Sequence, residues 1–172
     1  MSNAPNRSLG FNIEVPSDVM SEQSLIASVL LGGNRLLRSL TAIDKSMFYR
    51  VSHSLIWESY VAIDKAGQDI DIVTLNEELT KRNALEPAGG LAYIMQCAEL
   101  LPSTSNYESY AKLVTDYHRR REVIFASEFA SKRASIGDDD VETIVRDLNN
   151  SVTFINISSS SVYGNVSKKP MK

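Results

Sequence analysis

The sequence has few of the residues that build covalent cross-links, metal centres and nucleotide sites. Its single cysteine, Cys97, excludes an intramolecular disulfide and any metal site made of several thiolates. No lysine follows a glycine, so the loop G-x-x-x-x-G-K-[ST], whose backbone amides and lysine hold phosphates, is missing from this chain. We therefore expect no ATP site, no metal and no other cofactor in these 172 residues.

Long apolar runs are missing as well. No stretch approaches 18 consecutive apolar residues, so we expect no membrane span. The first ten residues, MSNAPNRSLG, lack the apolar core of a signal peptide. Together with the single cysteine, these absences predict a soluble, cytoplasmic protein. An apolar content of 43% is sufficient for a buried core, and the length favours one compact domain with an appendage.

The charges are unevenly distributed, although the formal net charge is only -3. So small a net charge does not indicate a general nucleic-acid binder. Residues 107–137 contain six basic and four acidic side chains, whereas residues 138–150 contain one basic and five acidic side chains. This order predicts two neighbouring helices of opposite charge.

The first part of the chain is divided by turn residues into short helical segments. Leu25, Ile26 and Val29 recur at the spacing of one helical face, and the sequence Gly-Gly-Asn at 32–34 ends that segment. Further short helices follow, separated by glycines and prolines. The pattern predicts a compact all-α head of about six short helices at 17–104.

Two details of the head are specific enough to test. Thr74 and Glu77 have the spacing of a capping box, which predicts the start of a helix at Thr74. The apolar run at 70–73 is only four residues long, and we interpret it as a connector rather than a strand.

The second part predicts two long helices. Ser105 and Glu108 form another capping-box pattern, and no glycine or proline follows until Gly137, which allows a helix of about thirty residues. Asp139 and Glu142 then predict the start of a partner helix. Its apolar positions follow coiled-coil-like spacing: Val141, Ile144, Val145, Leu148, Val152 and Ile155. The short connection predicts an antiparallel hairpin.

Four segments are therefore predicted. They are a flexible leader at 1–16, the helical head at 17–104, the helical hairpin at 105–156 and a serine-rich linker or tail at 157–172.

A two-helix hairpin is too thin to bury the apolar side chains on all its faces. We therefore expect self-association through the hairpin, with dimers as the unit and a trimer of dimers as a further possibility. Aromatic side chains of the first long helix are the candidate interface: Tyr117, Phe125 and Phe129.

The run Arg119-Arg120-Arg121 is the one concentrated positive patch in the sequence. It is interpreted either as a solvated helix face or as a docking surface for an acidic partner or nucleic acid. In a third interpretation, these arginines pair with the acidic segment at 138–147 on the return helix. Three consecutive helical residues span too wide an arc for all of them to face one neighbour.

The remaining polar residues give weak signals for chemistry. Cys97, His53 and His118 lie on three different predicted helices, which argues against a zinc site. Cys97 is interpreted as a small core residue and His53 as a cap or core contact. Adjacent carboxylates such as Glu77 and Glu78 do not face each other on a helix, so they are interpreted as a solvated face.

A DNA-reading helix-turn-helix at 74–100 is also disfavoured. The second helix of that motif would be the one to enter the major groove, and here it has neither lysine nor arginine.

Several segments resemble the N-terminal domain of DnaB-type replicative DNA helicases. The matching stretches are, in order, EQSLIASVLL, FYRVSHSLIWESY, GQDIDIVTLNEEL and GGLAYIMQCAELLPSTSNYESYAKLV. The resemblance implies a helical head with a two-helix hairpin, and a role in ring assembly and in docking of the primase. A helicase loader is a further implied partner, and little direct DNA binding is expected of this domain.

In that family a motor domain carries ATP, Mg and the DNA site, and the resemblance implies that it lies outside this chain. The chain itself is then not an enzyme. Two other functions stay open at this point: a free-standing accessory or inhibitory relative of the helicase domain, and a small DNA-binding regulator.

Overall fold

The computed structural model describes residues 14–101 and 103–162, and helices are the only regular secondary structure within this range. The helices are α1 (Val19–Ser39), the 3-10 helix η1 (Lys45–Met47), α2 (Val51–Lys65), α3 (Ile72–Lys81), α4 (Gly90–Glu99), α5 (Tyr107–Ile136) and α6 (Val141–Val162). The all-α prediction is confirmed, and the described residues contain no strand. Of the predicted leader and tail, residues 1–13 and 163–172 lie outside the described residues. The prediction that the tail begins at residue 157 was wrong, because α6 continues to Val162.

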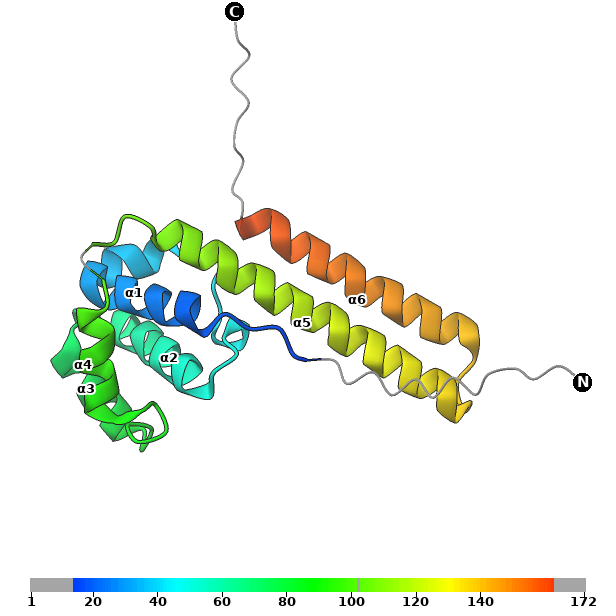
Figure 1. Cartoon of the computed structure of the whole chain (residues 1–172), viewed down its shortest axis with the longest axis horizontal. Coiled ribbons are helices and arrows are strands. Elements are labelled where there is room, and N and C mark those ends of the chain that lie inside the picture. The colour runs from blue at the N-terminus through cyan, green and yellow to red at the C-terminus, as the bar shows by residue number, and fades with distance from the viewer. Residues whose placement is uncertain (1–13, 102, 163–172) are drawn as a thin grey trace, which may run out of the picture.

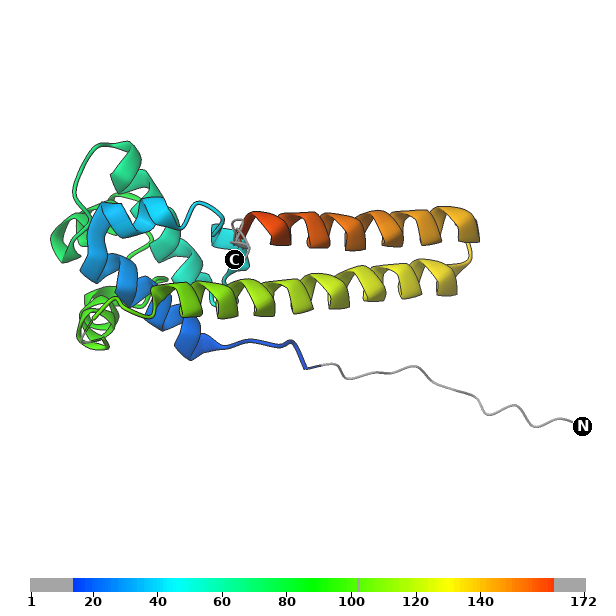
Figure 2. The ribbon, with the colours of Figure 1, turned by 90° about the horizontal axis from the view of Figure 1, so that it is seen from above.

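Helices α1 to α4 gather into a head, and α5 and α6 extend from it as an antiparallel hairpin (Figure 1). Viewed from above, the two long helices run side by side away from the head (Figure 2). Residues 14–18, which precede α1, lie on the side of α5 in the same view, and Pro16 contacts Arg121 of that helix. None of the described helices is both long and apolar enough to cross a membrane.

The head contains four α-helices and one 3-10 helix, fewer than the six short helices expected. The reason lies at Gly33, where the predicted break is a kink inside α1 rather than a loop. Gly33 has φ 63° and ψ -160°, a backbone conformation that residues other than glycine rarely adopt. The chain changes direction there and resumes its helix at once.

The predicted capping boxes were wrong in position. Helix α3 is capped by Asp71, whose side chain accepts from the backbone N–H of Thr74 at 2.8 Å, so Thr74 is the third helical residue rather than the cap. Helix α5 follows Asn106, which makes no side-chain cap. Helix α6 is preceded by Asp140, which accepts from the backbone N–H of Thr143.

The apolar core lies within the head, between α1, α2, α3 and α4 and the first turns of α5. Trp57 and Tyr60 are its largest buried side chains, and Ala111 and Val114 bring α5 against it. Beyond these turns the hairpin leaves the core. Farther along the hairpin, side chains are buried where the two long helices touch, as at Ile144, or where α5 still meets the head, as at Arg121.

The tip of the hairpin is closed by one arginine. Arg133 of α5 donates to Asp139 in the connecting turn at 2.6 Å and to Asp147 of α6 at 2.8 Å. The prediction of oppositely charged neighbouring helices is therefore confirmed, and Arg133 supplies a positive charge that pairs with the acidic segment.

Candidate functional site

Exposed large apolar side chains recur along both helices of the hairpin. Phe125 and Phe129 are 50% and 63% exposed, and Ile136 is exposed as well. At 100° per residue, spacings of 4 and 11 residues bring all three within about 40° of one another around the helix axis. These residues, here called the phenylalanine stripe, lie on one side of α5.

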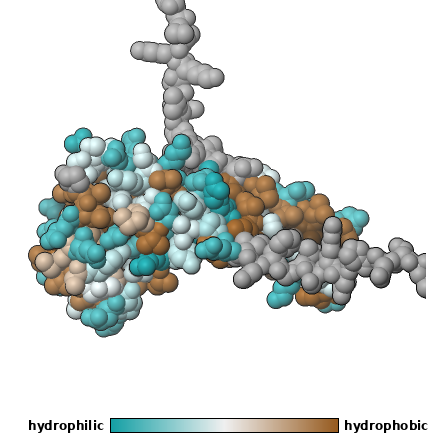
Figure 3. All heavy atoms as spheres, in the orientation of Figure 1, coloured by the Kyte–Doolittle hydropathy of each residue, from teal (hydrophilic) through white to brown (hydrophobic). Residues whose placement is uncertain are grey.

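A second line of apolar side chains follows α6. Val141, Val145 and Val152 are exposed and repeat the same spacing of 4 and 11 residues. Brown, apolar atoms cover much of the visible part of the hairpin in Figure 3. A monomer in water rarely keeps such surface uncovered, so these lines indicate a contact face.

The predicted interface residues do not all lie together. Phe125 and Phe129 share the phenylalanine stripe, whereas Tyr117 lies eight residues before Phe125, about 80° away around the axis. Tyr117 is partly buried, and the Arg120 guanidinium lies 6.0 Å from the centroid of its ring. The Phe129 ring is similarly approached by Arg133, at 5.5 Å.

The three consecutive arginines take different positions, as the helix geometry requires. Arg120 is exposed and pairs with Asp116 on its own helix at 2.9 Å. Arg121 is buried and donates to two backbone carbonyls of other segments. Its guanidinium is therefore not available at the surface, which removes Arg121 from the predicted docking patch.

Arg119 lines an open groove with Pro16 and Arg120, and the apolar part of its wall is Val123, Ile124 and Ile155. The groove has a volume of about 520 Å3 and lies on the hairpin beside the incoming leader. Docking by Arg119 and Arg120 stays a prediction.

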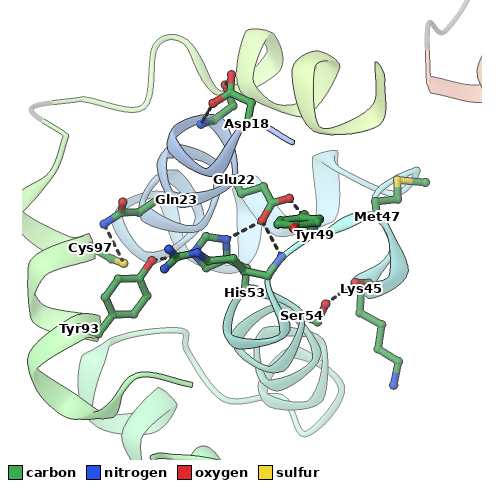
Figure 4. Close-up of polar contacts among 12 residues, drawn as sticks. Asp18, Glu22, Gln23, Lys45, Met47, Tyr49, His53, Ser54, Tyr93 and Cys97 are labelled. Atoms are coloured by element: carbon green, nitrogen blue, oxygen red, sulfur yellow. Dashed lines mark hydrogen bonds and ion pairs between the residues drawn. The ribbon is translucent and has the colours of Figure 1, made fainter. Parts of the chain in front are cut away.

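A buried polar cluster lies at the centre of the head (Figure 4). The Glu22 carboxylate of α1 accepts from the backbone N–H groups of Tyr49 and Arg50, at 2.5 and 3.3 Å, and lies 2.7 Å from Nδ1 of His53. The other ring nitrogen of His53 lies 2.6 Å from the Tyr93 hydroxyl of α4. The cluster thus joins α1, α2 and α4.

This arrangement explains how a histidine is accommodated in the interior of the head. Both ring nitrogens are occupied by protein partners. Glu22 also completes the start of α2, because Arg50, the residue before that helix, has no side-chain cap. The interpretation of His53 as a core contact is confirmed, but neither Glu22 nor Tyr93 gave a signal in the sequence.

Cys97 is a core residue of the head. It is fully buried, and the Gln23 amide lies 3.8 Å from its sulfur. Burial raises the pKa of the Cys97 thiol, which keeps it protonated and unreactive. The described residues contain no group of three or more histidine, cysteine or acidic side chains that could hold a metal.

A wider groove of about 750 Å3 lies between the end of α1 and α2. Leu37 and Trp57 line it, and ion pairs cross its rim, from Arg38 to Asp64 and from Lys45 to Glu58. These four charged side chains are thus paired with one another across the rim.

The architecture of a helical head with a long hairpin has a counterpart among known proteins. The family described as the DnaB-like helicase N terminal domain matches residues 14–116. This chain belongs to that family. The match covers the head and the first turns of α5, where the core and the buried cluster lie.

Replicative helicases are similar in sequence over the same region. The Bacillus subtilis replicative DNA helicase DnaC is 27% identical over 130 residues, which are 76% of this chain and 29% of that helicase. The replicative DNA helicase DnaB of Buchnera aphidicola is 30% identical over 127 residues, or 74% of this chain and 27% of that protein. The chain therefore spans less than a third of the length of these relatives.

Solved structures show the same fold. The N-terminal domain of DnaB helicase from Mycobacterium tuberculosis superposes with a TM-score of 0.76 at 23% identity, covering 82% of this chain and 99% of that one. A second counterpart is a DnaB-like replicative helicase, whose structure was described with its interactions with primase. It superposes with a TM-score of 0.66 at 18% identity, and the match covers 82% of this chain and 31% of that one. What this chain matches is thus the non-catalytic N-terminal domain of the helicases.

Proposed function

We propose that this DnaB-type N-terminal domain mediates assembly of a helicase ring and docks the primase during DNA replication. The observation that carries the proposal is the exposed apolar surface on both helices of the hairpin, on a domain of this family. The proposal includes a cytoplasmic location, contact with a helicase loader and little direct binding of DNA.

Self-association is supported by the cost of leaving this surface in water. Burial of apolar surface contributes about 25 cal/mol per Å2, and a stable interface buries roughly 1,600 Å2 in total. Phe125 and Phe129 are the candidate anchors, because large aromatic side chains dominate the energetics of interfaces. Two copies could bury these side chains against each other, with dimers as the unit from which a larger ring is built.

Primase docking is supported by two observations. One structural counterpart is a DnaB-like helicase described with its interactions with primase. In this chain Arg120 is exposed beside the groove that Arg119 lines, and guanidinium groups form paired hydrogen bonds with carboxylates. An acidic segment of the primase is the partner that this chemistry fits.

Sedimentation equilibrium tests the assembly step. Wild-type protein is expected to form dimers or larger species, and the double variant Phe125→Ser, Phe129→Ser is expected to be monomeric while keeping its helical content. Val51→Ser with Val73→Ser is the matched control, because both valines are exposed on the head. A wild-type monomer at high concentration, or equal loss of association in the control, would contradict the proposal.

A further inference from the structure

Arg121 lies in the middle of α5, yet it is only 5% exposed. Its Nη1 donates to the backbone carbonyl of Pro16 at 3.1 Å, and its Nη2 donates to that of Met47 at 2.6 Å. Pro16 belongs to the segment before α1, and Met47 ends η1. One side chain of the hairpin therefore binds two separate segments of the head.

The surroundings of Arg121 suit a permanent positive charge. Its guanidinium lies 5.8 Å from the centroid of the Tyr49 ring, within the range of a cation–π contact. Burial lowers the pKa of Arg121, and the negative charge of Glu22 acts in the opposite direction. Since an arginine side chain stays protonated in proteins, the head holds a buried cation at this point. Tyr49 links this cation to the buried cluster, because its ring lies beside Arg121 and its backbone N–H donates to Glu22.

The position of Arg121 along α5 gives this contact its importance. The other buried residues of α5, within the described part of the chain, are Ala111, Val114 and Thr115, all in its first three turns. Arg121 lies six residues farther, which at 1.5 Å per residue adds about 9 Å to the length of helix held by the head. It is the outermost buried residue of α5 in the structure.

We propose that Arg121 is a tether that fixes the direction of the hairpin relative to the head. The apolar contacts of Tyr107, Tyr110, Ala111 and Val114 hold the first turns of α5 on the head. Contacts confined to these turns leave the rest of the helix able to tilt. The two hydrogen bonds of Arg121 add an attachment farther out and thereby remove that freedom. Arg121 is thus a positioning residue, and the proposal concerns one chain, independently of whether chains associate.

The neighbouring arginine provides a matched control. Arg120 is exposed and makes its ion pair within α5, to Asp116, so its removal leaves the contacts between head and hairpin intact. Replacing either arginine by methionine keeps an unbranched side chain on the helix and removes one positive charge. A difference between Arg121→Met and Arg120→Met therefore reports the tether rather than charge or helix propensity.

Distances between two spin labels test the proposal. In a Cys97→Ala background, labels are placed by Gln68→Cys on the head and Lys132→Cys near the hairpin tip, both exposed positions. Labelled protein is diluted with an excess of unlabelled protein, so that associated chains contribute no distance. Wild type and Arg120→Met are expected to give one narrow distance distribution, and Arg121→Met a distribution at least twice as broad.

The outcome that overturns the proposal is an Arg121→Met protein that is folded by circular dichroism and keeps the narrow wild-type distribution. If Arg121→Met does not fold, the width of the distance distribution is measured for Arg121→Lys instead. An ammonium group retains the charge but cannot reach both carbonyls with the planar fork of a guanidinium. A broadened distribution supports the tether, and a narrow one contradicts it.

Discussion

The Glu22 carboxylate and the His53 imidazole meet at 2.7 Å in the interior of the head, with side-chain exposures of 2% and 0%. Glu22 comes from α1 and His53 from α2, and the same carboxylate accepts the backbone N–H groups of Tyr49 and Arg50. One buried acidic side chain therefore acts as the cap of a neighbouring helix.

Removal of this carboxylate is expected to destabilise the head strongly. Glu22→Ala leaves two backbone donors and one imidazole N–H without their partner, and breaking a buried polar pair costs about 3 to 5 kcal/mol. Glu58→Ala is the control, because Glu58 pairs with Lys45 near the surface, where such pairs contribute less than about 1 kcal/mol. Urea unfolding measures the free energy of unfolding of both variants. A decrease for Glu22→Ala as small as that for Glu58→Ala would contradict the role of Glu22.

The kink in α1 is expected to depend on the absence of a side chain at Gly33. Gly33→Ala places a Cβ at φ 63° and ψ -160°, which should cost about 1 to 3 kcal/mol. At Gly137, φ is 80° and ψ is 11°, close to the left-handed region that L-residues can enter at about 1 kcal/mol. Thermal unfolding is expected to show a larger loss of stability for Gly33→Ala than for Gly137→Ala. The reverse order would contradict the role of Gly33 in the kink.

The hairpin tip is expected to loosen at acid pH. The Arg133 guanidinium holds the pKa of Asp139 below its ordinary value of 3.8. A carboxyl group whose pKa is lower in the folded protein stabilises it above the unfolded pKa, and this contribution is lost as the pH falls through the folded pKa. Amide exchange in the first turns of α6 should therefore be protected at pH 6 and lose protection below about pH 3.8, after correction for the intrinsic exchange rate.

Arg133→Met provides the control for that pH dependence. Without the guanidinium, the protection that depends on this ion pair should already be absent at pH 6. A wild-type tip whose protection does not change between pH 6 and pH 3 would contradict the role of the ion pair.

Primase docking is expected to depend on Arg119 and Arg120. A pulldown with the cognate primase should show at least a tenfold weaker interaction for the double variant Arg119→Ala, Arg120→Ala, because charge-assisted hydrogen bonds to the partner are lost. Lys81→Ala with Lys65→Ala, two exposed lysines of the head, is the control for loss of general positive charge. Unchanged binding with unchanged assembly would eliminate these arginines as the docking site.

The sequence predicted the hairpin more accurately than the head for a physical reason. The helix from Tyr107 to Ile136 is bounded by glycine at Gly137 and uninterrupted within, so local composition determines its length. The head depends on contacts between distant segments. Gly33 was read correctly as an interruption, but only packing of Leu36 and Leu37 into the core makes the helix resume immediately.

Capping patterns were misassigned because they are common in polar turns. Around α3 both Asp71 and Thr74 can act as caps, and both take part in the observed capping box. The Asp71 side chain accepts from the Thr74 backbone N–H, and the Thr74 hydroxyl accepts from the Asp71 backbone N–H. The same limitation applies to Glu22 and Arg121. Each is a charged residue in a helical pattern, for which exposure is the ordinary expectation, and only partners far away in the sequence make burial favourable.

The distance between Arg121 and the end of α5 magnifies any change of helix direction at Arg121. Fifteen residues follow Arg121 in that helix, a lever of about 22 Å at 1.5 Å per residue. A tilt of roughly 10° at the attachment would move the tip by about 4 Å, close to the 4.0–4.5 Å within which apolar atoms count as touching. The accuracy with which the Arg121 contact holds α5 therefore determines how accurately the hairpin tip is placed against any surface.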